Sequence, residues 1–167
     1  TIPECSSSKE ILDIVNNNIF LIGNISNLPP EGTIFPDTYF FLRNDDKNII
    51  ISRMQRKMDK MVASIWKKNN YLIKSKGDLI NLASLIEAEA GNNYEKYIIS
   101  SVFYNRINKG MRLQSDPTIL YYKNLKNKIN SRKILKKDLQ LDNPWNTYTR
   151  MGLPLTPICS PGLKALD

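Results

Sequence analysis

Residues 79–90 form a segment that is apolar on nearly every face of the helix that it predicts. Gly77 and Asp78 precede this segment and Gly91 follows it, as at the start and the C-terminal cap of a helix. A helix without a polar face has to be surrounded by other elements, so we expect it in the middle of the domain. The rest of the chain must then be arranged around it.

Three more helices are expected. The first begins near the capping-box pattern of Ser7 and Glu10, and the second follows the polar residues 44–46. The third runs from about residue 94 to residue 109. The side chains expected to face the core are Ile51, Met54, Met58, Met61 and Ile65 in the second helix and Ile98, Ile99, Val102, Phe103 and Ile107 in the third.

Residues 33–42 are rich in β-branched and aromatic side chains and are interrupted by Pro36 and Asp37. This pattern predicts two short strands around a bend. The segment after Gly110 is expected to consist mainly of loops. The predicted fold class is therefore α+β with helices dominant, and 167 residues suffice for one compact domain.

A net charge of +8 favours anionic partners, namely nucleic acid, acidic lipid or an anionic cell-wall polymer. The basic residues 123–137 lack the interleaved aromatic side chains of a nucleic-acid module, so we expect a solvated loop and no nucleic-acid partner. No apolar stretch approaches the roughly 20 residues of a membrane-spanning helix. The chain has no histidine, which excludes a Ser-His-Asp triad and any histidine-containing metal site.

Two cysteines, Cys5 and Cys159, have no metal-ligand spacing. Small buried thiols are the expected state for both. A disulfide between them is the less favoured alternative, and it requires an oxidising compartment.

Two carboxylates, Glu87 and Glu89, lie within the apolar helix, where a charged group needs a partner or a function. Residues two apart on a helix point about 200° apart, so both cannot face one cleft. Small and apolar neighbours favour Glu87 for a site, because an apolar setting raises a carboxyl pKa. Glu89 is then expected to face solvent or a basic partner. The alternative for Glu87 is a buried salt bridge, with Arg106 or Arg112 as the candidate partner.

Several blocks of sequence have a recognisable pattern. Residues 31–39 are EGTIFPDTY, residues 82–89 are LASLIEAE, and residues 101–106 and 110–118 are SVFYNR and GMRLQSDPT. The ending contains NTY at 146–148, GLP at 152–154 and PICSPG at 157–162. In this order, the blocks resemble the MltG/YceG-like endolytic murein transglycosylases.

The resemblance implies an enzyme that cuts peptidoglycan glycan strands within their length and leaves 1,6-anhydro-muramyl ends. It maps the catalytic acid to Glu87, which would protonate the glycosidic oxygen while the sugar's own 6-hydroxyl attacks. No second carboxylate, metal or cofactor is then needed. Amide, hydroxyl, charged and aromatic groups that suit sugar binding are expected around it: Asn105, Arg106, Gln114, Ser115, Asp116, Thr118, Asn146, Thr147 and Tyr148.

The resemblance also implies two parts in the chain. Residues 1–30 correspond to the end of a LysM-like module and a connector, and residues 31–167 to the catalytic domain, with C-terminal strands expected beyond Asp167. Family members are single-pass proteins of the bacterial cytoplasmic membrane, so an N-terminal anchor outside these residues, a catalytic domain on the periplasmic side and cell-wall synthases as partners are expected.

Two alternatives stay open at this point. One is a non-catalytic glycan-binding or scaffold module of the cell-wall elongation machinery. The other is a pyridoxal-phosphate-dependent aminodeoxychorismate lyase, the label under which this family has been catalogued. That cofactor needs a Schiff-base lysine and a phosphate cup, and the sequence contains no glycine-rich cup.

Overall fold

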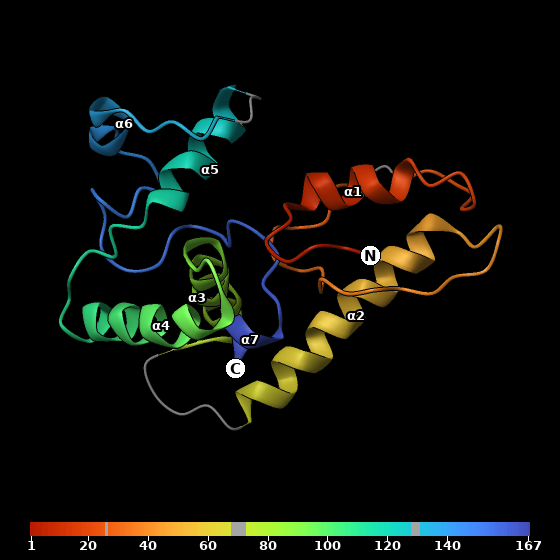
Figure 1. The fold of residues 1–167 in the computed structure, drawn as a ribbon, viewed down its shortest axis with the longest axis horizontal. Helices are drawn as coiled ribbons and strands as arrows, with labels where there is room; N and C mark the ends of the chain where they lie inside the picture. Colours follow the sequence, from red (N-terminus) through yellow and green to blue (C-terminus); the bar gives the residue numbers. More distant parts are fainter. Residues whose placement is uncertain (26, 68–72, 128–130) are drawn as a thin grey trace.

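The computed structural model describes residues 1–25, 27–67, 73–127 and 131–167. These ranges form seven helices, and their only β-pairing is a single parallel bridge between Ile22 and Asp46 (Figure 1). The helices are α1 (Ser8–Asn16), α2 (Lys47–Trp66), α3 (Lys76–Glu89), α4 (Asn93–Asn108), α5 (Asp116–Asn127), α6 (Lys136–Gln140) and α7 (Leu163–Leu166).

The expected helix-dominated fold is confirmed, but the two strands expected within residues 33–42 are absent. This segment is an irregular loop that lies along α2. Phe35 N donates to Met54 O at 3.4 Å, and Tyr39 Oη donates back to Phe35 O at 2.7 Å. The β-branched and aromatic side chains therefore pack against a helix instead of a neighbouring strand, and Pro36 could not donate to a strand ladder.

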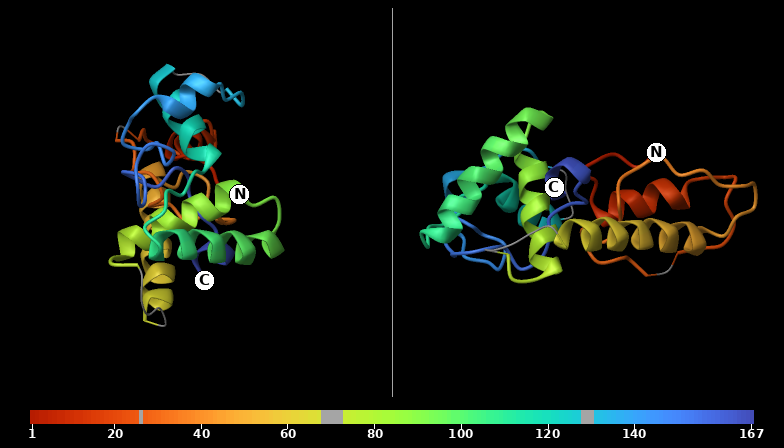
Figure 2. Two further views of the ribbon diagram at one scale, coloured as in Figure 1. Left: turned by 90° about the vertical axis from the view of Figure 1, so that its left-hand side faces the viewer. Right: turned by 90° about the horizontal axis from the view of Figure 1, so that it is seen from below.

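The described helices fall into two groups. Helices α1 and α2 lie side by side in one half of the molecule, whereas α3 to α7 form the other half (Figures 1 and 2). Each half has its own hydrophobic cluster. The first half of α2 contributes to the cluster under α1, and its second half packs against α3, so α2 joins the two halves.

Helix α3 is central, as its composition predicts. It packs against α2, α4, α5 and α7. All seven of its side chains from Asn81 to Glu87 are buried. A helix enclosed on every side fixes where its last turn emerges, and the polar groups of that turn form the candidate site.

One expectation about the helices is wrong. In α4, Ile98 and Val102 are exposed by 51% and 41%, whereas Phe103 faces the core as expected. Neighbouring helices cover only one narrow strip of α4. The spacing of its apolar residues therefore predicted a wider buried face than the helix has. The segment after Gly110 is mainly loop, as expected, but it also contains three helices that were not predicted, α5 to α7. Asp116 and Pro117 begin α5, since proline is well tolerated in the first turn of a helix.

Residues 1–30 share a hydrophobic cluster with the following segment. Ile2, Ile11 and Val15 are buried together with Ile34 and the first turns of α2. The proposed division at residue 30 and the LysM-like origin of residues 1–30 remain predictions. Among the described helices, none combines the length and the apolar character that crossing a bilayer requires.

Cys5 and Cys159 form a disulfide, so the expectation of two buried thiols is wrong. Their Cα atoms lie 4.8 Å apart. Backbone hydrogen bonds hold the two segments side by side, from Cys5 N to Ser160 O at 2.9 Å and from Ser160 N to Ser6 O at 3.0 Å. Because 154 positions separate the two residues, no local pattern could reveal this proximity.

Gly32 allows the close approach of three segments. Its φ is +77°, and a Cβ atom there would lie 2.7 Å from Pro157 Cβ and 2.8 Å from Ile80 Cγ2. We expect Gly32→Ala to lower the free energy of unfolding by about 2–4 kcal/mol, measured by urea denaturation, since backbone strain and overpacking add. Gly152→Ala is the matched control: its φ is +79° but its surroundings are open, so strain alone should cost about 1–2 kcal/mol. Equal losses in the two variants would contradict the packing argument.

Candidate active site

The two glutamates at the end of α3 have different surroundings, as their spacing predicts. Glu87 is only 8% exposed. Its Oε1 lies 2.6 Å from Lys96 Nζ on α4, and its Oε2 accepts a hydrogen bond from Gly162 N at 2.9 Å. Both oxygens of the Glu87 carboxylate are therefore engaged within the protein.

Lys96 completes this buried ion pair. Its side chain is almost entirely enclosed, and its Nζ also lies 3.3 Å from Glu4 Oε2. Burial opposes the charge of the ammonium group, but the hydrogen bond and the charge of Glu87 outweigh it and raise the pKa of Lys96. Lys96 therefore stays charged. The salt bridge considered for Glu87 exists, but with Lys96 rather than Arg106 or Arg112.

Glu89 is the last residue of α3 and lies on a different side of the helix. The helix ends at Ala90, so no following turn covers Glu89, and its side chain remains exposed to solvent. Ser115 Oγ donates a hydrogen bond to Glu89 Oε2 at 3.1 Å. One carboxylate oxygen is thereby oriented while the group stays accessible.

The environment of Glu89 raises its pKa. Partial desolvation of the carboxylate is the largest cause, and the nearby Asp116 carboxylate adds to it. The hydrogen bond from Ser115 and the positive charge of Arg106 act in the opposite direction. A glutamic acid that keeps its proton at higher pH than usual and still faces solvent can donate that proton to a bound molecule.

Asp116 and Tyr148 lie beside Glu89. Tyr148 Oη donates to Asp116 Oδ1 at 2.5 Å, and this bond fixes the loop that carries Tyr148 against the start of α5. Desolvation and the Asp116 carboxylate raise the pKa of Tyr148 to about 12, so the phenol remains a hydrogen-bond donor. Its half-buried ring offers an apolar face next to the acid.

Four of the predicted site residues are buried, and their polar groups bond within the protein. Ser115 N donates to Thr147 Oγ1 at 2.9 Å, and Thr118 Oγ1 donates to Ser115 O at 2.7 Å. Asn146 joins Leu139 O and Leu141 O to the backbone of Tyr148. Direct sugar contact by these residues stays a prediction, but their contacts support a positioning role for Thr118, Asn146 and Thr147.

Two of the remaining predicted residues, Arg106 and Gln114, border the same region. Asn105 and Gln114 are exposed, and Gln114 has a left-handed backbone with φ of 52°. Gln114 N donates to Thr147 O at 3.1 Å, which ties this turn to the loop that carries Tyr148. Arg106 is half-buried and its guanidinium donates to Leu113 O, so its charge is held close to Glu89.

Comparison with known proteins supports one assignment. The model of the YceG-like family matches residues 1–167. The chain belongs to the YceG-like family. It is 40% identical over 164 residues to a protein of Bacillus subtilis (strain 168) named endolytic murein transglycosylase, covering 95% of this chain and 43% of the relative.

Other relatives agree with this YceG-like assignment. A protein of the same name from Streptococcus pneumoniae serotype 2 (strain D39 / NCTC 7466) is 34% identical over 142 residues, covering 82% of this chain and 25% of the relative. The crystal structure of a YceG-like protein from Listeria monocytogenes matches with a TM-score of 0.70 and 37% identity, covering 81% of this chain and 43% of that one. The chain thus spans less than half the length of these relatives.

The polar environment of Glu89 was not predicted from the sequence of this YceG-like chain. Ser115, Asp116 and Tyr148 were expected around Glu87, and the structure places them beside Glu89. One signal was available: Ala90 and Gly91 end the helix directly after Glu89, which leaves that side chain uncovered. Lys96 carried no signal, because a single lysine on a predicted helix is normally solvated.

Proposed function

We propose that this chain carries the catalytic centre of an endolytic murein transglycosylase, with Glu89 as its general acid and base. One observation carries the proposal: the Glu89 carboxyl is reachable from solvent and oriented by Ser115, and partial desolvation raises its pKa. The names of the Bacillus and Streptococcus relatives support the reaction type. The substrate is then the glycan strand of peptidoglycan.

In this reaction, protonated Glu89 gives its proton to the glycosidic oxygen between a muramic acid residue and the next sugar. The bond from that oxygen to C1 breaks, and the 6-hydroxyl oxygen of the same muramic acid attacks C1. The hydroxyl proton passes to the Glu89 carboxylate, which restores the acid. The product is a 1,6-anhydro-muramyl end, and the intramolecular attack benefits from a high effective concentration.

The sequence blocks assigned the role of acid to Glu87, and the contacts support Glu89 instead. Glu87 is bonded to Lys96 and to Gly162 N, so its proton would have to be donated from an occupied, buried carboxylate. Glu89 has one oxygen oriented by Ser115 and a face open to solvent. Around it, Gln114, Asp116 and Tyr148 offer polar groups and a ring for sugars, and a sugar contact by Asn105 stays a prediction.

A second candidate reaction rests on Asp116. Its carboxylate lies close enough to raise the pKa of Glu89, and a glycoside hydrolase uses two neighbouring carboxylates. Asp116, however, accepts the Tyr148 hydroxyl, which engages it in a structural contact. A hydrolase would release reducing muramic acid ends, whereas a lytic transglycosylase releases anhydro ends.

Digestion of purified peptidoglycan, analysed by mass spectrometry, tests the proposal. We expect internal anhydro-muramyl ends from the chain and none from Glu89→Gln. Reducing ends that disappear in Asp116→Asn would establish the hydrolase. Binding of peptidoglycan without any turnover would support the non-catalytic glycan-binding module instead.

Activity should depend on pH through Glu89. The reactive form is protonated, so kcat/KM should fall as pH rises through the raised pKa of Glu89. Asp116→Asn removes a negative charge that raises this pKa, so the decline should move to lower pH while turnover at acidic pH persists. Rates measured between pH 4 and pH 8, approximately, cover the range of a raised glutamate. A decline at the same pH in both proteins would argue against Glu89 as the titrating acid.

We also propose that the chain acts outside the bacterial cytoplasmic membrane, on its periplasmic side. The Cys5–Cys159 disulfide supports this, because disulfides persist in oxidising compartments. A single-pass anchor in the longer protein and an association with cell-wall synthases belong to the same proposal. Alkylation of the two cysteines in intact cells, with and without reductant, tests the compartment.

A further inference from the structure

The exposed face of α2 carries four cations that the proposed reaction does not use. Arg53 and Lys57 are four residues apart, as are Arg56 and Lys60, so the four cations form two adjacent rows in one stripe. A groove of about 590 Å³ runs between this stripe and the loop at residues 38–40. We call it the cationic groove; its charged side chains are Arg53, Arg56, Lys57 and Lys60.

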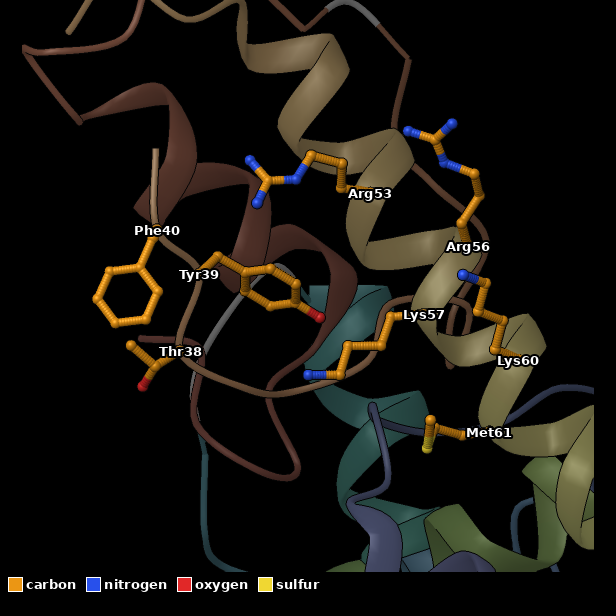
Figure 3. A pocket seen from close by; sticks show the side chains of 8 residues that line it. All are labelled: Thr38, Tyr39, Phe40, Arg53, Arg56, Lys57, Lys60 and Met61. Atoms are coloured by element: carbon orange, nitrogen blue, oxygen red, sulfur yellow. The ribbon is translucent and has the colours of Figure 1, made fainter. Parts of the chain in front are cut away.

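The two walls of the cationic groove differ in chemistry (Figure 3). From α2, Arg53 and Lys57 point toward the loop, and Met61 lies at one end. The loop contributes the Tyr39 ring and Phe40, whose side chain is 84% exposed. Such a groove suits a ligand that has anionic groups together with small apolar parts.

Most of this charge has no counterion in the described part of the chain. Lys57 is paired with Asp37, and its Nζ lies over the Phe35 and Tyr39 rings at 5.4 and 5.6 Å from their centroids. Within the described ranges, no salt bridge involves Arg53, Arg56 or Lys60. Like charges four residues apart destabilise a helix, so a bound anion would reduce the repulsion between these side chains.

One contact links the segment that leads to the groove with the helix that begins at the proposed active site. Glu31 accepts a hydrogen bond from Tyr121 Oη of α5 at 3.4 Å, and α5 begins at Asp116. Residues 31–38 span at most about 25 Å from this contact to the groove. A stem peptide of four or five residues reaches only about 15 Å when extended, so the groove would receive a stem peptide from a sugar of the strand beyond the cleavage site.

We infer that the cationic groove binds the carboxylates of a peptidoglycan stem peptide. This inference rests on the proposed function, which makes peptidoglycan the substrate. The proposed active site contains two carboxylates, Glu89 and Asp116, and one nearby cation, Arg106, so it offers less positive charge to an anionic peptide than the cationic groove does. The alternative partner, an anionic membrane surface, is flat and contacts protruding side chains, whereas Arg53 and Lys57 point into a hollow.

Titration of the full chain with a free stem peptide, followed by calorimetry, tests the inference without any turnover. The variant Arg53→Gln/Arg56→Gln/Lys60→Gln leaves Lys57 and its Asp37 contact intact. We expect it to bind the peptide at least about tenfold more weakly than the unchanged chain. The matched control removes three exposed lysines outside both sites, Lys9→Gln/Lys74→Gln/Lys76→Gln, and should retain the affinity.

A second ligand identifies the recognised group. The same peptide with its carboxylates converted to amides should bind about as weakly to the unchanged chain as the free peptide does to the groove variant. Equal affinity for both peptides, an equal loss in the control variant, or binding of anionic vesicles without binding of the peptide would each overturn the inference. If the peptide binds as expected but no anhydro ends are produced, the groove stands and the proposed reaction fails.

Discussion

Replacing Glu89 by glutamine should reduce the rate of glycan cleavage by about 10³-fold or more. The change keeps the size of the side chain and its ability to accept the Ser115 hydroxyl, but it removes the proton that the leaving oxygen needs. General acid catalysis contributes about 10²- to 10⁴-fold, and here the same group also acts as the base. Initial rates of anhydro-end formation on purified strands, quantified by mass spectrometry, measure the effect.

Two further variants sharpen this result. Glu89→Asp keeps the acid but withdraws it by one methylene, so a loss of about 10²-fold is expected from misplacement alone. Glu87→Gln should keep the turnover per folded molecule within about tenfold of the unchanged chain, because Glu87 is engaged with Lys96. If Glu87→Gln is inactive and Glu89→Gln is active, with both proteins folded, the acid is Glu87, as the sequence blocks predicted.

Glu87→Gln should have its largest effect on stability instead. The substitution leaves the buried Lys96 ammonium without its nearest countercharge. Breaking a buried pair from one side costs about 3–5 kcal/mol, and Glu4, at 3.3 Å, compensates only in part. We therefore expect urea denaturation to show a loss of about 3 kcal/mol in the free energy of unfolding.

A double-mutant cycle separates the pair from its surroundings. Lys96→Met alone leaves the Glu87 carboxylate buried and unpaired, so it should cost a similar amount. Glu87→Gln/Lys96→Met removes both charges, and its loss should be clearly smaller than the sum of the two single losses. Additive losses would mean that the ion pair contributes no coupling energy and that each side chain stabilises the fold independently.

The helices of this chain could be predicted where the local signals agree. The capping box of Ser7 and Glu10 begins α1, Asp46 caps α2, and the fully apolar α3 is central. In each case, a hydrogen bond or a burial pattern within one turn determines the element. The prediction of strands within residues 33–42 was wrong. β-branched side chains indicate a buried segment, and this segment is buried against a helix instead of a neighbouring strand.

The candidate site was predictable in composition but not in arrangement. Ser115, Asp116 and Tyr148 were expected near a glutamate of α3, and their contacts bring them to Glu89. Which glutamate faces them depends on the rotation of α3 relative to α5. That rotation is set by packing against four other helices. It therefore cannot be predicted from the local sequence of α3. Lys96, the partner of Glu87, comes from α4 for the same reason.

The disulfide can form only after several helices have been synthesised and folded. Cys5 leaves the ribosome before α1 to α6 have been synthesised, whereas its partner Cys159 follows them. Until then Cys5 is a free thiol that can pair with the wrong molecule. Helices α1 to α6 must therefore bring the two cysteines together before the bond can form. The crosslink then secures an arrangement that these helices have already reached.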